Sequence, residues 1–177
     1  MKNNYFDLLA LPMILPIDLS QLSLNYQQLQ KQYHPDNYAT ASESEKMAVV
    51  QKSATINAAY QTLKDPIKAA EYRVALEGIN INEEQQTIHD SEFLQEQFML
   101  REQLDEIDQV HDFERLELFY DEILKRKNQV YLQLLAYINQ SNWLATKQPL
   151  YQLRYFVKLI EQIELQQEKH FDLYTNL

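Results

Sequence analysis

The hydrophobic positions in the first third of the chain recur at helical spacing. Between Asp18 and the next proline, apolar side chains follow at steps of four, three and four residues: Leu22, Tyr26, Leu29 and Tyr33. Such spacing is typical of a helix buried along one face. Asp18 is suited to cap its N-terminus, with Gln21 in capping-box position. The helix should end at His34-Pro35, because proline pushes the residue before it out of the α region.

A second helix is expected to begin at Ser42 or Ser44 and to end at Asp65-Pro66. Ser42 and Glu45 have the spacing of a capping box. The predicted apolar face comprises Met47, Val50, Ala54, Ala58 or Ala59, and Leu63, with Ile56 and Tyr60 on a neighbouring stripe. The loop between the two helices is short, so they should pack antiparallel as a hairpin with His34-Pro35-Asp36 at its tip.

A shorter helix should follow directly, over residues 67–76. Pro66 can occupy its first position, and Gly78 stands where a C-terminal cap is expected. The residues after this helix read as a linker, at 77–82. The predicted domains are therefore 1–76 and 83–177.

Three long amphipathic segments make up the rest of the chain, at about 91–109, 112–139 and 142–173. Asp90-Ser91 should cap the first, and Ser141-Asn142 should break the chain before the last. Long helices with short connections favour an antiparallel bundle. Its predicted core comprises Leu116, Phe119, Tyr120, Ile123, Leu124, Tyr131, Leu134, Leu135, Leu150, Leu153, Val157, Ile160 and Leu165.

The first of these segments has two apolar sides, since each residue turns the helix by about 100°. One stripe, assigned to the core, consists of Phe93, Leu100, Leu104 and Ile107. The roughly opposite side carries Leu94, Phe98, Met99, Glu102 and Glu106. An exposed apolar patch edged by charge is typical of a protein-binding site. Burial of the helix on two sides by its own bundle explains the pattern equally well.

Composition supports an all-α fold with a sizeable core. The 177 residues include one Gly and five Pro, too few for a fold with many turns, and 45% of them are hydrophobic. With no cysteine, disulfides and thiolate ligation of zinc or an iron–sulfur cluster are excluded. We see no signal or transit peptide and no apolar run near the ~18 residues of a membrane span. The expected location is the cytoplasm.

Charge is distributed unevenly along a chain whose net charge is −10. Residues 1–76 hold seven basic and seven acidic side chains, whereas residues 83–122 hold two basic and fourteen acidic ones. The asymmetry indicates two parts with different partners, although acidic helices can also serve solubility alone. Nucleic-acid binding usually needs a basic surface. We therefore expect neither a nucleic-acid nor a membrane partner.

Few residues indicate chemistry of their own. The other histidines are not spaced as metal ligands, and a single Gly excludes a Gly-rich phosphate loop. The carboxylates at 83–84 and 105–108 are better explained as solvated helix surface than as a metal site. We expect no metal, no cofactor and no catalytic residue. Taken alone, His34-Pro35-Asp36 is most simply a capped turn in which Asp36 bonds the local backbone.

In its context, however, this loop resembles the signature of a J domain. The matching positions are Tyr5-Phe6, Leu9, Pro12, Tyr33-His34-Pro35-Asp36, the run from Ile56 through Asn57, Ala58, Tyr60 and Leu63 to Asp65-Pro66, and Ala70-Glu71-Tyr72. J domains bind a DnaK-type chaperone ATPase and stimulate its ATP hydrolysis. The resemblance implies that His34, Pro35 and Asp36 carry that stimulation. It implies a chaperone-binding surface on the preceding helix, at Tyr26, Gln30, Lys31 and Gln32.

Two positions depart from the J-domain pattern. Asn37 stands where many J domains have Lys, and the helix before the loop carries Lys31 as its one cation. Since a DnaK-type partner reads this helix partly by charge, docking should be weaker here or depend more on Tyr26, Gln30 and Gln32.

The second half of the chain extends the resemblance. The string from Asp90 to Ile107, DSEFLQEQFMLREQLDEI, is similar to the signature of the HscB family, and the likeness covers the whole chain. HscB proteins are J-type co-chaperones of iron–sulfur cluster assembly, L-shaped, whose bundle binds the scaffold IscU for the chaperone HscA. The scaffold-binding positions implied here are Leu94, Gln95, Phe98, Met99, Glu102, Glu106 and Tyr155. Gln95 and Met99 depart from the Met and the acid of relatives.

The leading hypothesis is an adaptor and not an enzyme. It would bring IscU to HscA and stimulate hydrolysis of ATP by that partner. Because no cysteine-rich N-terminal extension is present, the resemblance points to a bacterial-type member. An alternative is a J protein that serves a general DnaK-type chaperone and another client. A hydrolase using His34 and Asp36 as a dyad would need a nucleophile beside them, which the adjacent helices do not offer.

Overall fold

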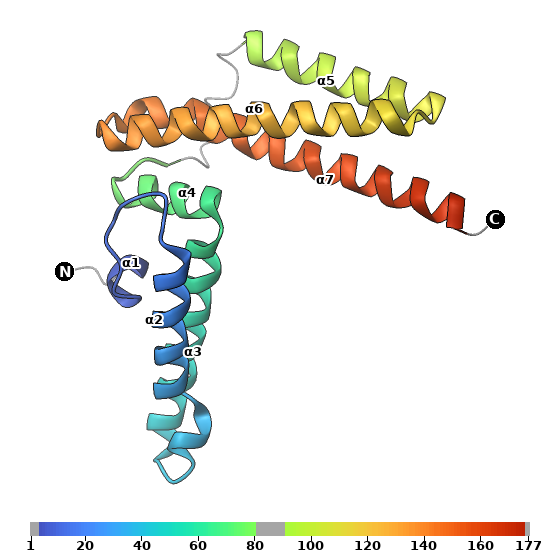
Figure 1. Ribbon diagram of the computed structural model, residues 1–177. Helices are drawn as coiled ribbons and strands as arrows, with labels where there is room; N and C mark the ends of the chain where they lie inside the picture. Colours follow the sequence, from blue (N-terminus) through green and yellow to red (C-terminus); the bar gives the residue numbers. More distant parts are fainter. Residues whose placement is uncertain (1–3, 81–90, 176–177) are drawn as a thin grey trace. The chain divides into compact units, whose positions relative to one another are not determined.

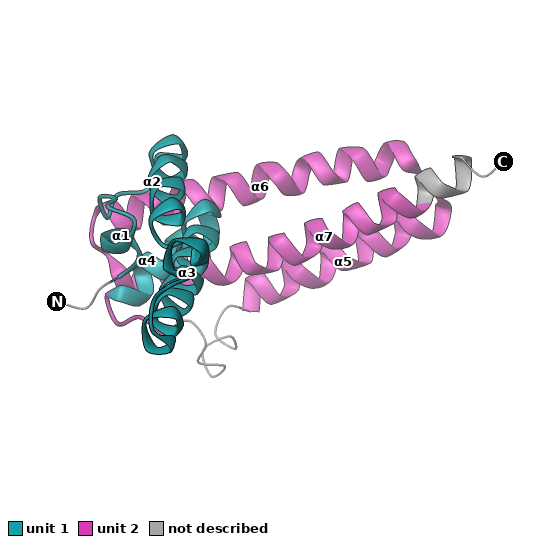
Figure 2. Ribbon diagram, turned by 90° about the horizontal axis from the view of Figure 1, so that it is seen from below, with its two compact units in different colours: residues 1–76 teal, residues 77–177 magenta. Residues whose placement is uncertain are grey.

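The computed structural model describes residues 4–80 and 91–175, and their side chains as far as residue 169. In these ranges every regular element is a helix, which confirms the all-α prediction (Figure 1). The contacts divide the chain into two compact units, Met1–Leu76 and Glu77–Leu177 (Figure 2). The end of the linker expected at 77–82, and the expected cap Asp90, lie outside the described residues.

Unit 1 is a helical hairpin with short helices packed against it. Its elements are α1 (Tyr5–Leu8), α2 (Leu19–Gln32), the 3₁₀ turn η1 (Pro35–Tyr38), α3 (Glu43–Lys64) and α4 (Pro66–Leu76). Figure 1 shows α2 and α3 side by side and antiparallel, with η1 at the end where they join, as predicted. The α3 helix also contacts α1 and α4, so it is the central element of the unit.

The α2 helix begins and ends where the sequence predicts. The Asp18 carboxylate accepts hydrogen bonds from the backbone N–H groups of Ser20 and Gln21. The predicted capping box is wrong, because the Gln21 amide donates to Asn25 Oδ1 instead. Leu22 is buried, whereas Tyr26, Leu29 and Tyr33 are only half-buried, since α2 lies at the surface of a small unit.

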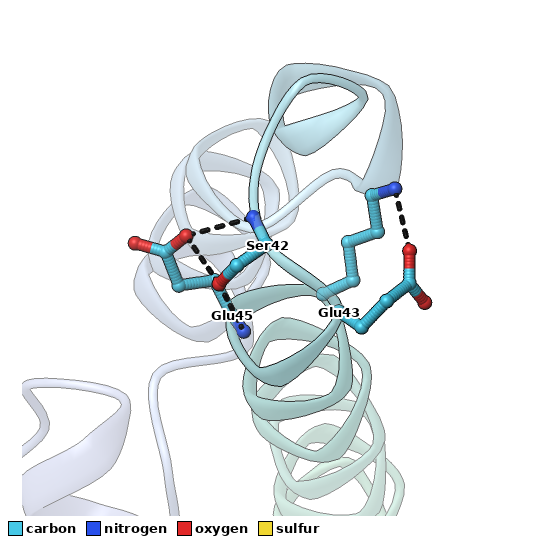
Figure 3. Close-up of polar contacts among 4 residues, drawn as sticks. Ser42, Glu43 and Glu45 are labelled. Carbon is cyan, nitrogen blue, oxygen red and sulfur yellow. Dashed lines mark hydrogen bonds and ion pairs between the residues drawn. The ribbon is translucent and has the colours of Figure 1, made fainter.

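The predicted capping box of α3 is confirmed (Figure 3). Ser42 Oγ accepts from Glu45 N at 3.3 Å, and a Glu45 carboxylate oxygen accepts from Ser42 N at 2.9 Å. At the other end, Asp65 accepts from the N–H groups of Ile67 and Lys68, so that α4 begins at Pro66 as expected. Gly78 follows with a φ of 82°.

The predicted apolar face of α3 is largely wrong. Met47, Val50 and Ala54 are exposed, and the buried positions are Val49, Ile56, Ala59 and Leu63. Leu63 is therefore confirmed, and so is Ala59 of the two alternatives Ala58 and Ala59. The observed stripe has steps of seven, three and four residues. Alanines fill both candidate stripes, and their small side chains leave the phase of the pattern undetermined. The contacts with α1, α2 and α4 select the stripe that contains Ile56.

Unit 2 is an antiparallel three-helix bundle. It contains α5 (Ser91–Val110), α6 (Phe113–Asn139), the 3₁₀ turn η3 (Trp143–Thr146) and α7 (Lys147–Thr175), and Figure 1 shows the chain reversing at each turn. His111 and Ser141 adopt positive φ values of 52° and 54° at the two breaks. The connection predicted at Ser141-Asn142 is therefore confirmed, but a 3₁₀ turn comes between it and α7.

The core of unit 2 follows the prediction on α5 and α6 more closely than on α7. The predicted stripe of α5 is buried throughout, as are Leu116, Phe119, Ile123, Leu134, Leu150, Leu153 and Ile160. Tyr120, Leu124, Tyr131, Leu135 and Val157 are partly buried. Leu165 is exposed, and the prediction missed Tyr155, Phe156, Leu159 and Ile163. The α7 sequence is apolar on more than one side, so its spacing alone does not choose the face that meets α5 and α6.

Candidate functional site

The hairpin tip of unit 1 presents the His34-Pro35-Asp36 motif to solvent. His34 has the extended backbone expected before proline, and its carbonyl accepts from Asn37 N at 3.0 Å. Its ring Nδ1 lies 3.3 Å from Asp36 N, so the imidazole caps the turn. The turn is thus capped by His34 and not by Asp36. The side chains of His34 and Asp36 remain 56% and 89% exposed, which leaves both available to a partner.

Asn37 and Tyr38 tie the tip to the end of α2. Asn37 Nδ2 donates to the Lys31 carbonyl at 2.7 Å, and Tyr38 Oη donates to the Gln32 carbonyl at 3.4 Å. Carbonyls of the last helical turn lack intrahelical partners. The asparagine that stands in place of the usual lysine therefore has a structural role in this chain.

The α2 residues predicted to bind a chaperone do not form one face. Tyr26 Oη donates to Asn57 Oδ1 at 3.0 Å, and its ring stacks on Tyr60 with centroids 4.0 Å apart. Gln30 donates to the same Asn57 oxygen, so both side chains are engaged by α3. Lys31 and Gln32 are exposed, and at 100° per residue they point away from that edge.

A cation that the sequence reasoning missed lies next to the tip. Lys52 Nζ on α3 is 6.0 Å from the centroid of the Tyr33 ring. Tyr33 is the residue directly before His34 in the chain. Lys52 could have been found from the predicted antiparallel pairing of the two helices, because this pairing brings the first half of α3 beside the end of α2. Lys52 thus adds positive charge where α2 supplies only Lys31.

A hollow of about 390 Å³ opens beside the motif. It is lined by Pro35, Asp36, Tyr38, Ala39, Lys46, Val49 and Val50. We call the motif and this hollow the tip surface. Its apolar wall combined with one carboxylate and one ammonium suits a protein partner.

The second candidate site is the solvent side of α5. Leu94, Phe98 and Met99 are exposed, although they are large and apolar, and Gln95, Glu102 and Glu106 are exposed with them. We call these six residues the outer face of α5. Since the opposite stripe fills the bundle core, α5 is not buried on two sides by unit 2, and that alternative is excluded.

Tyr155 does not join the outer face. It is 9% exposed and packs edge-on against Phe93, with ring centroids 5.7 Å apart. Its hydroxyl donates to the Gln97 carbonyl at 3.0 Å. Burial raises the pKa of Tyr155, and the neighbouring Arg101 opposes the shift. Tyr155 thus lies beneath α5 and supports it from α7.

The described residues contain no group of His, Cys, Asp and Glu side chains arranged to hold a metal ion. Over the same part of the chain, no helix is both long and apolar enough to cross a membrane.

Two family models match the two halves of the chain. Residues 4–73 match the DnaJ domain, and residues 89–164 match the HSCB C-terminal oligomerisation domain.

Solved structures resemble the chain over nearly its whole length. Chaperone HscB from Vibrio cholerae is 39% identical, over 94% of this chain and 99% of that one, with a TM-score of 0.84. The human co-chaperone protein HscB is 27% identical, over 93% and 82% of the two chains, with a TM-score of 0.86. The Jac1 co-chaperone from Saccharomyces cerevisiae shares the fold, with a TM-score of 0.75 over 93% of this chain and 96% of that one. Its sequence is 24% identical.

A J domain with an exposed His-Pro-Asp tip, followed by a helical bundle of this type, defines a J-type co-chaperone. The match to the bundle model and the identity to the Vibrio cholerae protein narrow the class further. The chain belongs to the HscB family, the J-type co-chaperones of iron–sulfur cluster assembly. Membership implies a DnaK-type chaperone as partner and a scaffold protein as client.

Proposed function

We propose that this chain is a cytoplasmic adaptor that binds the cluster scaffold IscU and delivers it to the chaperone HscA, whose ATP hydrolysis it stimulates. The chain itself carries out no reaction in this proposal. The observation that carries the proposal is the outer face of α5, where large apolar side chains stay exposed on a helix of the HscB-type bundle.

The outer face has the composition of a binding site. Phe98 is 68% exposed, with Leu94 about one turn before it and Met99 directly after it in the helix. Exposed apolar clusters of this kind mark interaction surfaces on soluble proteins. Glu102 and Glu106 continue the face toward the C-terminal end of α5. A scaffold surface with an apolar patch beside basic residues would be complementary to it.

The tip surface provides a contact for the ATPase. With Nδ1 facing the Asp36 N–H as an acceptor, a neutral His34 ring carries its proton on Nε2 and can donate it outward. The exposed Asp36 carboxylate can accept a charge-assisted hydrogen bond from a cation of the partner. Pro35 fixes the backbone between these two groups. The tip therefore offers one donor and one acceptor at a defined spacing.

Steady-state ATPase assays with purified proteins test the proposal. We expect the full chain to raise HscA turnover, and IscU to raise it further by delivery of the client. Stronger stimulation of a general DnaK than of HscA, with no effect of IscU, would favour the alternative of a J protein with another client. ATP hydrolysis by the isolated chain would contradict the adaptor role.

A further inference from the structure

The α5 helix carries apolar side chains on two sides, and only one of them faces the bundle. The buried stripe contains Phe93 and Leu100, and the outer face contains Leu94, Phe98 and Met99. Hydrophobic burial is non-directional and depends mainly on the apolar area removed from water. In the N-terminal half of α5, burial alone therefore discriminates weakly between the two faces. Other contacts have to fix the rotation of the helix about its axis.

An ion-pair cluster from α6 provides the first such contact. Arg126 Nη1 lies 2.6 Å from Glu96 Oε1 on α5, and Arg126 Nη2 lies 2.5 Å from Glu122 Oε1. Glu122 is four residues before Arg126 on the same helix, so it orients the guanidinium toward α5. The planar fork of arginine makes such a two-carboxylate contact directional.

A hydrogen bond from α7 provides the second contact. The Tyr155 hydroxyl donates to the Gln97 carbonyl at 3.0 Å, and the ring packs against Phe93. The donor is held in the core by its aromatic neighbours and is close to fully buried. Tyr155 belongs to α7, so this hydrogen bond ties α5 to the second of its two partner helices.

The two contacts lie on opposite sides of the buried stripe. At about 100° per residue, Glu96 is displaced by about 50° to one side of the stripe centre and Gln97 by about 50° to the other. They are adjacent residues, so both contacts act on one helical turn. Rotation of α5 in either direction would stretch one of them. Together they bracket the stripe and define the rotation of the helix.

We propose that Arg126 and Tyr155 are positioning residues, which determine that the apolar face with Phe98 is the one presented to a partner protein. Their link to scaffold binding rests on the proposed function, whereas their effect on α5 does not. The expected consequence of losing both contacts is a helix that turns its outer apolar side chains partly inward.

Single cysteines can report the rotation directly, because the natural chain has none. Met99→Cys places a thiol at a position that is 59% exposed, and Leu100→Cys places one at the next position, which is 4% exposed. Each is introduced alone into the full chain, and its rate of reaction with a water-soluble maleimide is measured. In the native background we expect the first thiol to react much faster than the second.

The same rates are then measured with Arg126→Met and Tyr155→Phe combined. Rotation in either direction carries position 100 away from the core, so the thiol of Leu100→Cys should react faster. The thiol of Met99→Cys or that of Phe98→Cys, whichever lies on the side that turns inward, should react more slowly. A matched background, Lys125→Met with Tyr120→Phe, removes a neighbouring cation and a hydroxyl that bonds Glu164 between α6 and α7. It should leave these rates unchanged. Arg126→Lys, which keeps the cation, should restore part of the native pattern.

The direction of the two changes distinguishes rotation from loosening. If the thiols at positions 98, 99 and 100 all become more reactive in parallel, α5 is merely destabilised and the positioning role is overturned. Unchanged rates overturn it as well. If Leu100→Cys does not fold, Ile107→Cys on the same buried stripe replaces it.

Binding to IscU is measured by calorimetry on the same Arg126→Met, Tyr155→Phe chain without added cysteine. A roughly tenfold loss of affinity is expected, comparable to the loss of one interface anchor. Opposite shifts of the thiol rates with unchanged IscU affinity would support the positioning of α5 and count against the proposed scaffold site. The two ideas can therefore fail separately.

Discussion

His34 combines a structural and an exposed role within one imidazole. Nδ1 is close to both the Asp36 N–H and, at 3.5 Å, the Asp36 carboxylate. The first contact uses the ring as an acceptor and leaves its Nε2 side for a partner. A residue that only capped the turn could be replaced by Asn or Ser, but neither would present a donor at the same place.

We expect His34→Gln to abolish stimulation of the chaperone ATPase while leaving affinity for the scaffold unchanged. A flexible amide cannot both hold the turn and fix an outward donor. ATPase assays and calorimetry measure the two effects. His111→Asn, which removes an imidazole from unit 2, is the control and should stimulate normally. Normal stimulation by His34→Gln would refute the role of the tip.

Phe98→Ala should weaken scaffold binding by about 1–3 kcal/mol, as truncation of an interface anchor does. Because Phe98 is exposed in the free protein, the free energy of unfolding should change by less than about 0.5 kcal/mol. Leu118→Ala on α6 is a matched control, since Leu118 is 65% exposed but lies outside the outer face of α5. Equal affinities of the two variants in calorimetry would exclude this face as the site.

At the scale of the element, α3 depends on the capping box at its N-terminus. The hydrogen bond from the Ser42 side chain lowers the pKa of Glu45, and the hydrogen bond from the Ser42 backbone N–H lowers it further. A carboxylate whose pKa is lowered on folding stabilises the native state above its unfolded pKa, and the effect is lost as pH falls through the folded pKa. The first turn of α3 is therefore sensitive to acid.

Protection of the Lys46 amide, which donates to the Ser42 carbonyl, should decrease as the pH is lowered from about 7 to about 3. Hydrogen exchange, corrected for the intrinsic rate, measures the change. In Ser42→Ala, protection should be lower and should depend less on pH, because the hydroxyl that accepts from Glu45 N and donates to the Glu45 carboxylate is gone. An equal pH dependence in both proteins would show that Glu45 is not responsible.

The core face of α7 gives a prediction about stability. Ile163 is fully buried, whereas Leu165 is 55% exposed. Ile163→Ala should lower the free energy of unfolding by about 2–5 kcal/mol through lost burial and the cavity left behind. Leu165→Ala should change it by less than about 0.5 kcal/mol. Urea denaturation compares the two, and a larger effect at Leu165 would reverse the assignment of the core face.

Prediction from the sequence succeeded where the side chains are large and the boundaries carry chemical signals. Proline and the Ser42 cap predicted the limits of α2 and α3, and the bulky stripe of α5 was assigned correctly to the core. Whether the opposite side of α5 is exposed was left open by the sequence, because a second layer of helix would bury it equally well. The face of α3 was missed because alanines fit two stripes. The placement of Tyr155 and Lys52 depends on pairing between helices, which a single helical pattern does not contain.

At the scale of the whole molecule, the charges follow the division into two units. Unit 1 is neutral overall, and the entire net charge of −10 belongs to residues 77–177. Like charges gathered on one unit attract a basic partner over distances longer than a direct contact. Under the proposed function, client binding by unit 2 should therefore depend on ionic strength more strongly than chaperone binding by the J domain does.

Stopped-flow mixing with the scaffold tests this dependence. Between about 0.05 and about 0.5 M salt the association rate should fall severalfold, because the Debye length shrinks, while the dissociation rate changes little. Chaperone binding through unit 1 serves as the internal comparison, and its association rate should fall less over the same range of salt concentration. An equal salt dependence of the association rates with the two partners would mean that the acidic surface serves solubility and does not speed association with the scaffold.

The anchoring of the tip by Asn37 has a thermodynamic consequence for the complex with the ATPase. A long lysine side chain at this position would lose rotamer freedom when it docks. Asn37 is instead already bound to the Lys31 carbonyl, so its freedom is lost during folding. A side chain that is already held in place loses less freedom on docking, and such preorganisation lowers the entropic cost of association. Asn37 thus lacks the positive charge that a lysine would bring to the tip, and it carries a smaller ordering penalty on docking.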